Sequence, residues 1–361
     1  MIIILCTLLL QPSSASQDAL AAWLRDVGER GPHRPADLVY EIRIEEPAQR
    51  TPQDVRALAA AVKDKPDHPL RDEVRAEERR LAEGPDITDV VIFWNQEGSW
   101  RYNITLGPWA DAAIRFIDTC VRPDSAWRLT PEQLAIVDPP SGYPPGRDYA
   151  ANQGTFLNYV DAMLDGSLSR RVSGMKLEEA SVINGAWTAR FSRDGRVIEY
   201  SGMIVQDPRA GGIFEPHSWK VVSHPEREFV GEMEHYERWA FDEAIGQRVA
   251  HTVRFVRSDG APSRTVTLAG ARRLGRDEFH RISRIPEPGE KDPIRGDVRI
   301  TRVFDVRPGA MEVRFPQDDV RPSMPLSPAA TGSRSSQVAG AIAACAIVAA
   351  LVWLRLRRAS R

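Results

Sequence analysis

The sequence has few cysteines and almost no lysine. Three cysteines occur in 361 residues, and two of them, Cys6 and Cys345, lie in apolar terminal segments. The remaining Cys120 has no partner for an internal disulfide or for a CxxC zinc site, and its apolar neighbours predict a buried thiol. Arginine outnumbers lysine 43 to 5, which we interpret as the codon bias of a GC-rich genome. The fold must therefore depend on an ordinary hydrophobic core.

The common catalytic signatures are also missing. The sequence contains no GxSxG, no HExxH, no P-loop and no GxGxxG that opens a helix. A net charge of −2 and a pI near 6.4 argue against nucleic acid as a partner. No pattern indicates a cofactor. These absences favour a non-enzymatic role, and they leave enzymatic activity open.

The N-terminal residues have the pattern of a secretory signal. Residues 1–10 are almost entirely apolar, and small residues follow at 13–15. The apolar run is too short to span a bilayer, which favours a signal peptide over residues 1–15 with cleavage after Ala15. No basic residue precedes the run, so the alternative of a buried N-terminal strand stays open.

The C-terminal region predicts a membrane anchor. Val338–Leu354 contains 17 residues without a charge, about 26 Å as a helix, and an arginine-rich tail follows at 355–361. The positive-inside rule places that tail in the cytoplasm and the preceding chain outside. Residues 316–336, rich in Pro, Ser and Ala, indicate a tether. We thus expect an extracytoplasmic domain over 16–315, a tether, a single span over 337–354 and a basic cytoplasmic tail.

The predicted domain is α+β with mostly antiparallel strands. Helical spacing or capping signals predict helices at 18–27, 51–63, 70–83, 109–117 and 156–164. Alternation predicts a strand at 38–46 and a hairpin of 90–94 with 100–104. Further strands are expected at 179–191, 196–206, 217–223, 228–241, 248–257, 264–271, 278–285 and 297–306. Such spacing favours a curved meander or half-barrel sheet whose apolar side is covered by a few helices.

This layout resembles the periplasmic lipoprotein carriers of the LolA/LppX-like half-barrel class. The shared features are a secretion signal, an early helix, charged helices and a long antiparallel meander over residues 35–315. The resemblance is architectural and includes no diagnostic motif. It implies a concave apolar sheet face that can hold an acyl chain, although a shared fold does not fix a function.

Two histidines are candidate metal ligands. If 228–241 and 248–257 form a hairpin that pairs Phe241 with Ile245, His235 faces His251, and Glu237 lies on the same face. Two imidazoles and a carboxylate could bind a metal ion or titrate together. A slip of one residue in the register would separate them, and structural histidines are the alternative.

The segment 138–154 is the other candidate, because it holds four prolines and three glycines and predicts a long irregular loop. Long loops often carry function. Its side chains that could contact a ligand are Tyr143, Arg147, Asp148 and Tyr149. A plain connector is the alternative.

The sequence therefore favours a membrane-anchored envelope protein that binds a lipid, a lipidated partner or another envelope protein without catalysis. A hydrolase, metal-dependent or based on the histidines, is the first alternative. The second is an extracytoplasmic sensor, which would need a membrane partner because the tail is too short for an output domain.

Overall fold

The computed structural model divides the chain into two compact units. Unit 1 takes in the described residues up to Arg34, together with Asn158–Asp242 and Gln247–Thr265. Unit 2 comprises Pro35–Leu157, Glu243–Gly246 and the described residues from Val266 onward. The structure describes residues 14–31, 34–65, 67–95, 99–107, 110, 115–123, 125–131, 133–137, 150–209, 211–305, 307, 310, 312–316 and 324–325.

The sheet of unit 1 is an antiparallel meander. Its strands follow one another in chain order, because short turns connect neighbouring strands. At Asn184-Gly185 and Asp194-Gly195 both turn residues have positive φ, as type I′ hairpin turns require. The strands are β7 (Lys176–Ile183), β8 (Ala186–Arg193), β9 (Arg196–Asp207), β10 (Gly211–Ser223), β11 (Met233–Asp242) and β12 (Gln247–Val256).

One face of the unit 1 sheet is buried. On this inner face Trp187, Tyr200 and Trp219 are each at most 2% exposed. Helix α1 (Ser14–Arg30) contributes Trp23, whose ring lies edge-on to Trp187 at 5.8 Å and stacks on Phe214 at 5.2 Å. Helix α5 (Leu168–Val172) and the second half of α4 (Ala150–Asp165) also belong to unit 1. The period of two in β8 and β9 thus places aromatic residues on the inner face and polar residues in solvent.

The sheet of unit 2 is antiparallel except for one pair, since β14 runs parallel to β6. Along the sheet the order is β16-β15-β14-β6-β5-β4-β3-β2-β1-β13, and β13 (Pro262–Arg273) belongs to this unit from Val266. The other strands are β1 (Leu38–Glu46), β2 (Asp86–Trp94), β3 (Trp100–Leu106), β4 (Phe116–Val121), β5 (Ala126–Leu129), β6 (Leu134–Val137), β14 (Val303–Asp305), β15 (Glu312–Arg314) and β16 (Met324–Pro325).

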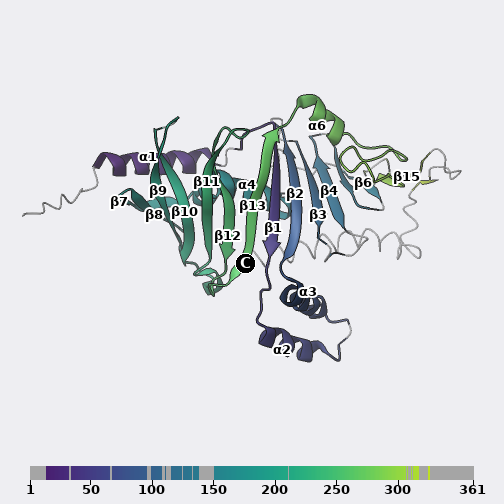
Figure 1. Cartoon of the computed structure of the whole chain (residues 1–361), viewed down its shortest axis with the longest axis horizontal. Coiled ribbons are helices and arrows are strands. Elements are labelled where there is room, and N and C mark those ends of the chain that lie inside the picture. Colours follow the sequence, from purple (N-terminus) through teal and green to yellow (C-terminus); the bar gives the residue numbers. More distant parts are fainter. Residues whose placement is uncertain are drawn as a thin grey trace, which may run out of the picture. The chain divides into compact units, whose positions relative to one another are not determined.

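A helical hairpin separates β1 from β2 in the sequence (Figure 1). Helix α2 (Pro52–Val62) begins with a capping box between Thr51 and Asp54, and α3 (Leu70–Glu83) ends at Gly84. The two helices pack through a small core that includes Val55, Val62 and Val74. At the base, buried Arg80 forms ion pairs with Glu77 at 2.8 Å and Asp86 at 2.7 Å. The last turns of α3 therefore carry charged residues that are buried in ion pairs.

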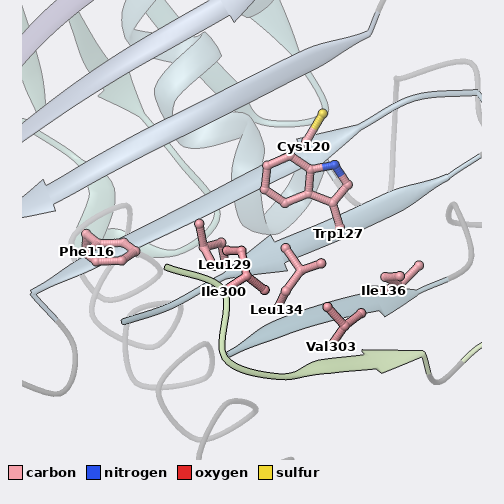
Figure 2. Packing of buried hydrophobic residues seen from close by; sticks show 8 residues of the cluster. All are labelled: Phe116, Cys120, Trp127, Leu129, Leu134, Ile136, Ile300 and Val303. Atoms are coloured by element: carbon pink, nitrogen blue, oxygen red, sulfur yellow. The ribbon is translucent and has the colours of Figure 1, made fainter. Parts of the chain in front are cut away.

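The C-terminal part of unit 2 covers one face of its sheet. Helix α6 (Arg276–Ser283) packs Phe279 and Ile282 against Val39 and Phe93. Farther along, Ile300 and Val303 join a hydrophobic cluster on β4, β5 and β6 (Figure 2). Its members are Phe116, Cys120, Trp127, Leu129, Leu134, Ile136, Ile300 and Val303.

Most predicted elements are observed. The prediction of an α+β chain with mainly antiparallel strands is confirmed, as are the strand at 38–46, the hairpin of β2 with β3 and the buried thiol of Cys120. Gly166, directly after α4 (Ala150–Asp165), has a φ of 66°, as is common for a glycine that ends a helix. The predicted strand 179–191 is two strands, because Asn184-Gly185 forms a turn inside it.

Other segments differ from the element predicted for them. Phe116 and Ile117, expected in a helix, begin β4, because they pair with Thr105 and Ile104 on β3. The segment expected as a strand at 278–285 is mostly α6, whose buried Phe279 and Ile282 are three residues apart, as on a helix face. Residues 150–154 belong to α4, although the sequence predicted an irregular loop there.

The predicted ends of the chain are outside the described residues. These are the signal peptide at 1–15 apart from 14–15, which begin α1, the tether apart from Pro316 and 324–325, the span at 337–354 and the tail at 355–361. Among the helices that the structure describes, none combines the length and the apolar character needed to cross a bilayer.

Candidate functional site

One face of the unit 2 sheet is lined by aromatic and aliphatic side chains. Residues directly opposite one another on paired strands share a face, so the register shows which side chains are neighbours. Tyr40 pairs with Ile92, Ile92 with Tyr102, and Tyr102 with Thr119. We call this surface the aromatic face; its residues are Leu38, Tyr40, Ile42, Val90, Ile92, Trp94, Trp100, Tyr102, Ile104, Ile117, Thr119 and Val121.

Burial of the aromatic face changes from one strand to the next. On β1 and β2, Ile42 and Val90 are at most 2% exposed. The same row continues to Ile104 on β3 and Ile117 on β4, and both are only partly buried. Beside this row the rings of Trp100 and Tyr102 stack at 4.4 Å. The described residues therefore leave an apolar surface partly accessible at β3 and β4.

A cationic residue lies next to the aromatic face. Thr119 pairs with Arg128 on β5, so the row that begins at Tyr40 continues to a partly buried arginine, and Arg128 in turn pairs with Ala135 on β6. Among the residues that the structure describes, no carboxylate forms an ion pair with Arg128. An apolar strip followed by a positive charge has the chemistry of a surface for an anionic amphiphile.

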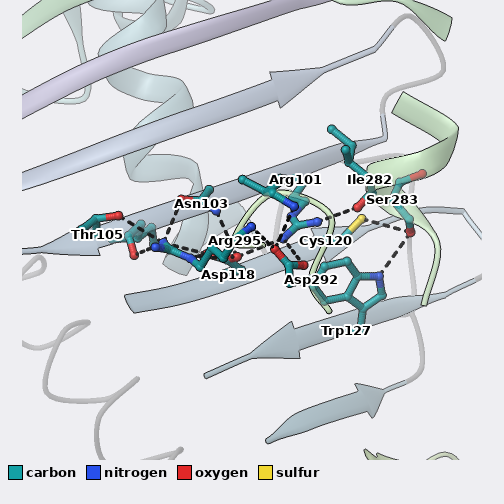
Figure 3. A network of polar contacts seen from close by, with 12 residues as sticks. Arg101, Asn103, Thr105, Asp118, Cys120, Trp127, Ile282, Ser283, Asp292 and Arg295 are labelled. Carbon is teal, nitrogen blue, oxygen red and sulfur yellow. Dashed lines mark hydrogen bonds and ion pairs between the residues drawn. The ribbon is translucent and has the colours of Figure 1, made fainter. Parts of the chain in front are cut away.

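The opposite face of the same strands carries a buried polar network (Figure 3). The side chain of Arg101 is fully buried, and its guanidinium donates to Asp118 at 2.9 Å, to Asp292 at 2.8 Å and to the carbonyl of Ile282 at 2.7 Å. Arg295 forms a second ion pair with Asp118 at 3.2 Å. These contacts attach the segment after α6 to β3 and β4.

Asp118 is the centre of that network. Burial raises the pKa of its carboxyl group above the ordinary value, and the charges of Arg101 and Arg295 act in the opposite direction. Its oxygens also accept a hydrogen bond from the amide of Asn103 at 3.1 Å. Because Asp118 is itself fully buried, we assign this network to stability.

Unit 1 contains a second buried group of charges, centred on Glu234 of β11. Glu234 is 1% exposed and accepts hydrogen bonds from Ser167 at 3.1 Å, from Tyr236 at 2.8 Å and from Arg171. Burial alone would raise the pKa of Glu234, but the charges of Arg171 and Arg170 outweigh it and lower that pKa. The guanidinium of Arg171 also lies 3.7 Å from the centre of the Trp219 ring.

The backbone at the start of α5 permits this arrangement. Gly166 has positive φ, and a Cβ there would lie 2.7 Å from Pro216 on β10 and 3.0 Å from Tyr236. The absence of a side chain lets the chain approach the sheet closely. Ser167, also at positive φ, then reaches Glu234.

Two carboxyl groups in unit 1 have pKa values raised to near neutrality. Burial raises the pKa of Asp165 to about 6, and the charge of Asp161 adds to that effect. Burial likewise raises the pKa of Glu232 to about 7, with Glu234 contributing in the same direction. Both groups therefore change charge within the physiological range.

The histidines predicted as metal ligands do not face each other. Phe241 pairs with Arg248 instead of Ile245, so His235 lies opposite Arg254. This three-residue difference from the assumed register moves His251 away from His235. Glu237 forms an ion pair with Arg254. In the described part of the chain, no group of three or more His, Cys, Asp or Glu side chains is arranged to hold a metal ion.

The four loop residues predicted to contact a ligand are outside the described residues. Tyr143, Arg147, Asp148 and Tyr149 remain a prediction. Sequence reasoning missed Glu234, Arg171 and Arg196. Alternation along β11 allows two arrangements, with either Glu234 and Tyr236 or His235 and Glu237 on the inner face. The hydrogen bond from the buried Tyr236 hydroxyl to Glu234 indicates the first arrangement.

Comparison with known proteins gives an architectural likeness. No protein-family model and no curated protein matches the chain. Among solved structures, a Vibrio parahaemolyticus domain named for outer membrane lipoprotein sorting is similar, with a TM-score of 0.36 and 8% identity over 74% of this chain and 97% of that one. A DUF1329 family protein from Desulfovibrio piger has a TM-score of 0.32 and 9% identity, over 73% of this chain and 93% of that one.

Proposed function

We propose that the chain is a non-enzymatic binding protein of the cell envelope and that its ligand is a lipid. The observation that carries this proposal is the aromatic face of unit 2. An acyl chain is recognised by apolar area rather than by directed bonds, at about 25 cal/mol for each Å² removed from water. A row that passes from the buried Ile42 and Val90 to the partly accessible Ile104 and Ile117 offers such area.

Arg128 supports the choice of an anionic lipid. Arg128 lies directly beside Thr119 in the row that contains Tyr102. An acyl chain against Ile104 and Ile117 would place a phosphate or carboxylate headgroup within the field of this cation. The membrane anchor at Val338–Leu354 and the extracytoplasmic location belong to the same proposal, because both put the domain where lipids are available.

The test is the lipid content of two variants of the full chain. Ile104→Glu puts a carboxylate on the accessible part of the aromatic face, and Ala60→Glu adds the same charge at an exposed position of α2. Because burying a charge beside an acyl chain is costly, we expect Ile104→Glu to reduce co-purified lipid about tenfold or more. The lipid would be extracted with organic solvent and quantified by mass spectrometry.

The control variant should retain the wild-type amount of lipid, and circular dichroism should show that both variants fold. Equal lipid content in folded Ile104→Glu and wild type would refute binding at the aromatic face. Absence of lipid from all three proteins would refute the proposed function.

A further inference from the structure

Three arginines of unit 1 lie in a group that we call the arginine cluster: Arg170, Arg171 and Arg196. The first two are adjacent in α5, and Arg196 begins β9. Their charges interact, because Arg171 and Arg170 both act to lower the pKa of Arg196. Alternation along β9 places Arg196 on the inner face with the buried Ile198 and Tyr200. The cluster thus joins the end of α5 to the inner face of the sheet.

The ion pairs of the arginine cluster are uneven. Arg171 is paired with Glu234. Asp161 lies 2.7 Å from Arg34 but 4.0 Å from Arg170, so it mainly neutralises Arg34. Arg196 forms no ion pair with any residue that the structure describes.

Hydrogen bonding is incomplete as well. The Nε–H groups of Arg170, Arg171 and Arg196 are buried, and none of them has a hydrogen-bond partner in the described structure. The side chains are nevertheless within reach of solvent, since Arg170 is 30% and Arg171 19% exposed. Burial, together with the charge of Arg171, lowers the pKa of Arg170 and of Arg196.

We propose that Arg170, Arg171 and Arg196 bind a phosphate group. Guanidinium groups present paired donors that match the oxygens of a tetrahedral anion, and a phosphate supplies the negative charge that the cluster lacks. This site lies in unit 1 and does not depend on lipid binding at the aromatic face of unit 2. A free phosphate ester and a phospholipid headgroup share the required chemistry.

Glu232 makes the site sensitive to pH. Its carboxyl group faces the charges of Arg171 on α5, Arg196 on β9, Glu234 on β11 and Glu228 in the short 3-10 helix Arg227–Phe229. With a pKa raised to about 7, Glu232 is neutral at pH 6 and ionised at pH 8. The ionised carboxylate compensates Arg171 and Arg196 and so competes with an anionic ligand, which makes binding stronger at pH 6.

The experiment measures anion binding to the full chain in detergent by calorimetry. Sulfate is the first probe, because its charge is constant between pH 6 and pH 8, and inorganic phosphate is the second. We expect Arg196→Gln to weaken both at pH 6 about tenfold or more, and Arg196→Lys to weaken them less. The matched control is Arg193→Gln, since Arg193 is an exposed arginine in the same hairpin. Glu232→Gln should reduce the difference in sulfate binding between the two pH values, and Asp165, with a pKa of about 6 beside Arg170, accounts for what is left.

A third probe, short-chain dihexanoyl phosphatidic acid, separates the two sources of phosphate. Tighter binding of this lipid than of inorganic phosphate, lost in Arg196→Gln, would support a phospholipid headgroup. Equal binding would support a soluble phosphate compound. Absence of sulfate and phosphate binding at millimolar concentration, or equal affinity in folded Arg196→Gln and wild type, would overturn the proposal.

Discussion

The two buried groups of charges differ in how their arginines are paired. In unit 2, Arg101 and Arg295 form ion pairs with Asp118, and Arg101 also pairs with Asp292. In the arginine cluster of unit 1, Arg196 forms no ion pair with any described residue, and the Asp161–Arg170 distance is 4.0 Å.

The difference separates a structural network from a candidate site. A buried ion pair holds elements in place, and removal of one partner leaves an uncompensated charge. An arginine group that is partly exposed and short of carboxylates can instead accept an anion from solution. Three stability measurements would test the comparison, beginning with the largest expected effect.

Asp118→Ala should destabilise unit 2 by about 3–5 kcal/mol, because it leaves the fully buried Arg101 without one of its carboxylates. Denaturant unfolding followed by circular dichroism would measure the change. The control is Glu290→Ala, which breaks the exposed pair with Arg284 and should cost about 0–1 kcal/mol. Similar losses in the two variants would show that the network is not a structural centre.

Asp165 should make unit 1 less stable as the pH rises from about 4 to about 6. Its pKa is raised to about 6 in the folded chain, against about 3.9 when unfolded, so the folded state binds more protons in this window. The loss is about 3 kcal/mol. Asp165→Asn should remove this slope from a series of unfolding curves at different pH, and an unchanged slope would contradict the assignment.

Ser167→Ala should have the smallest effect, about 1 kcal/mol, because Glu234 loses one donor and keeps Tyr236 and Arg171. The control is Ser223→Ala, whose hydroxyl donates to a carbonyl at an exposed position. Thermal unfolding would compare the two. A loss above about 3 kcal/mol for Ser167→Ala would mean that the stability of the Glu234 group depends on this one neutral donor. The Asp118 network does not depend on any single neutral partner, so the two groups would then differ in this respect.

The sequence predicted correctly those elements in which apolar residues recur at the spacing of a strand or a helix. The alternation at 38–46 gave β1, and the apolar runs on each side of 95–99 gave the hairpin of β2 and β3. The segment 278–285 was predicted as a strand because Phe279 and Ile282 are also compatible with an apolar strand. Their contacts with Val39 and Phe93 stabilise the helix instead.

The two charged groups could not be predicted, because their members are far apart in the sequence. Arg101 and Asp292 are separated by 191 residues, and Arg171 and Glu234 by 63. The predicted metal site depended on a register that local alternation does not determine. Pairing of Phe241 with Arg248 is fixed by the hairpin turn after Asp242.

Lipid binding is the central claim, and native mass spectrometry of the full-length protein tests it most directly. After gentle detergent removal in the gas phase, the account predicts a species heavier than the polypeptide by the mass of a phospholipid, and loss of that species in Ile104→Glu. A wild-type spectrum that contains only the mass of the polypeptide would contradict it.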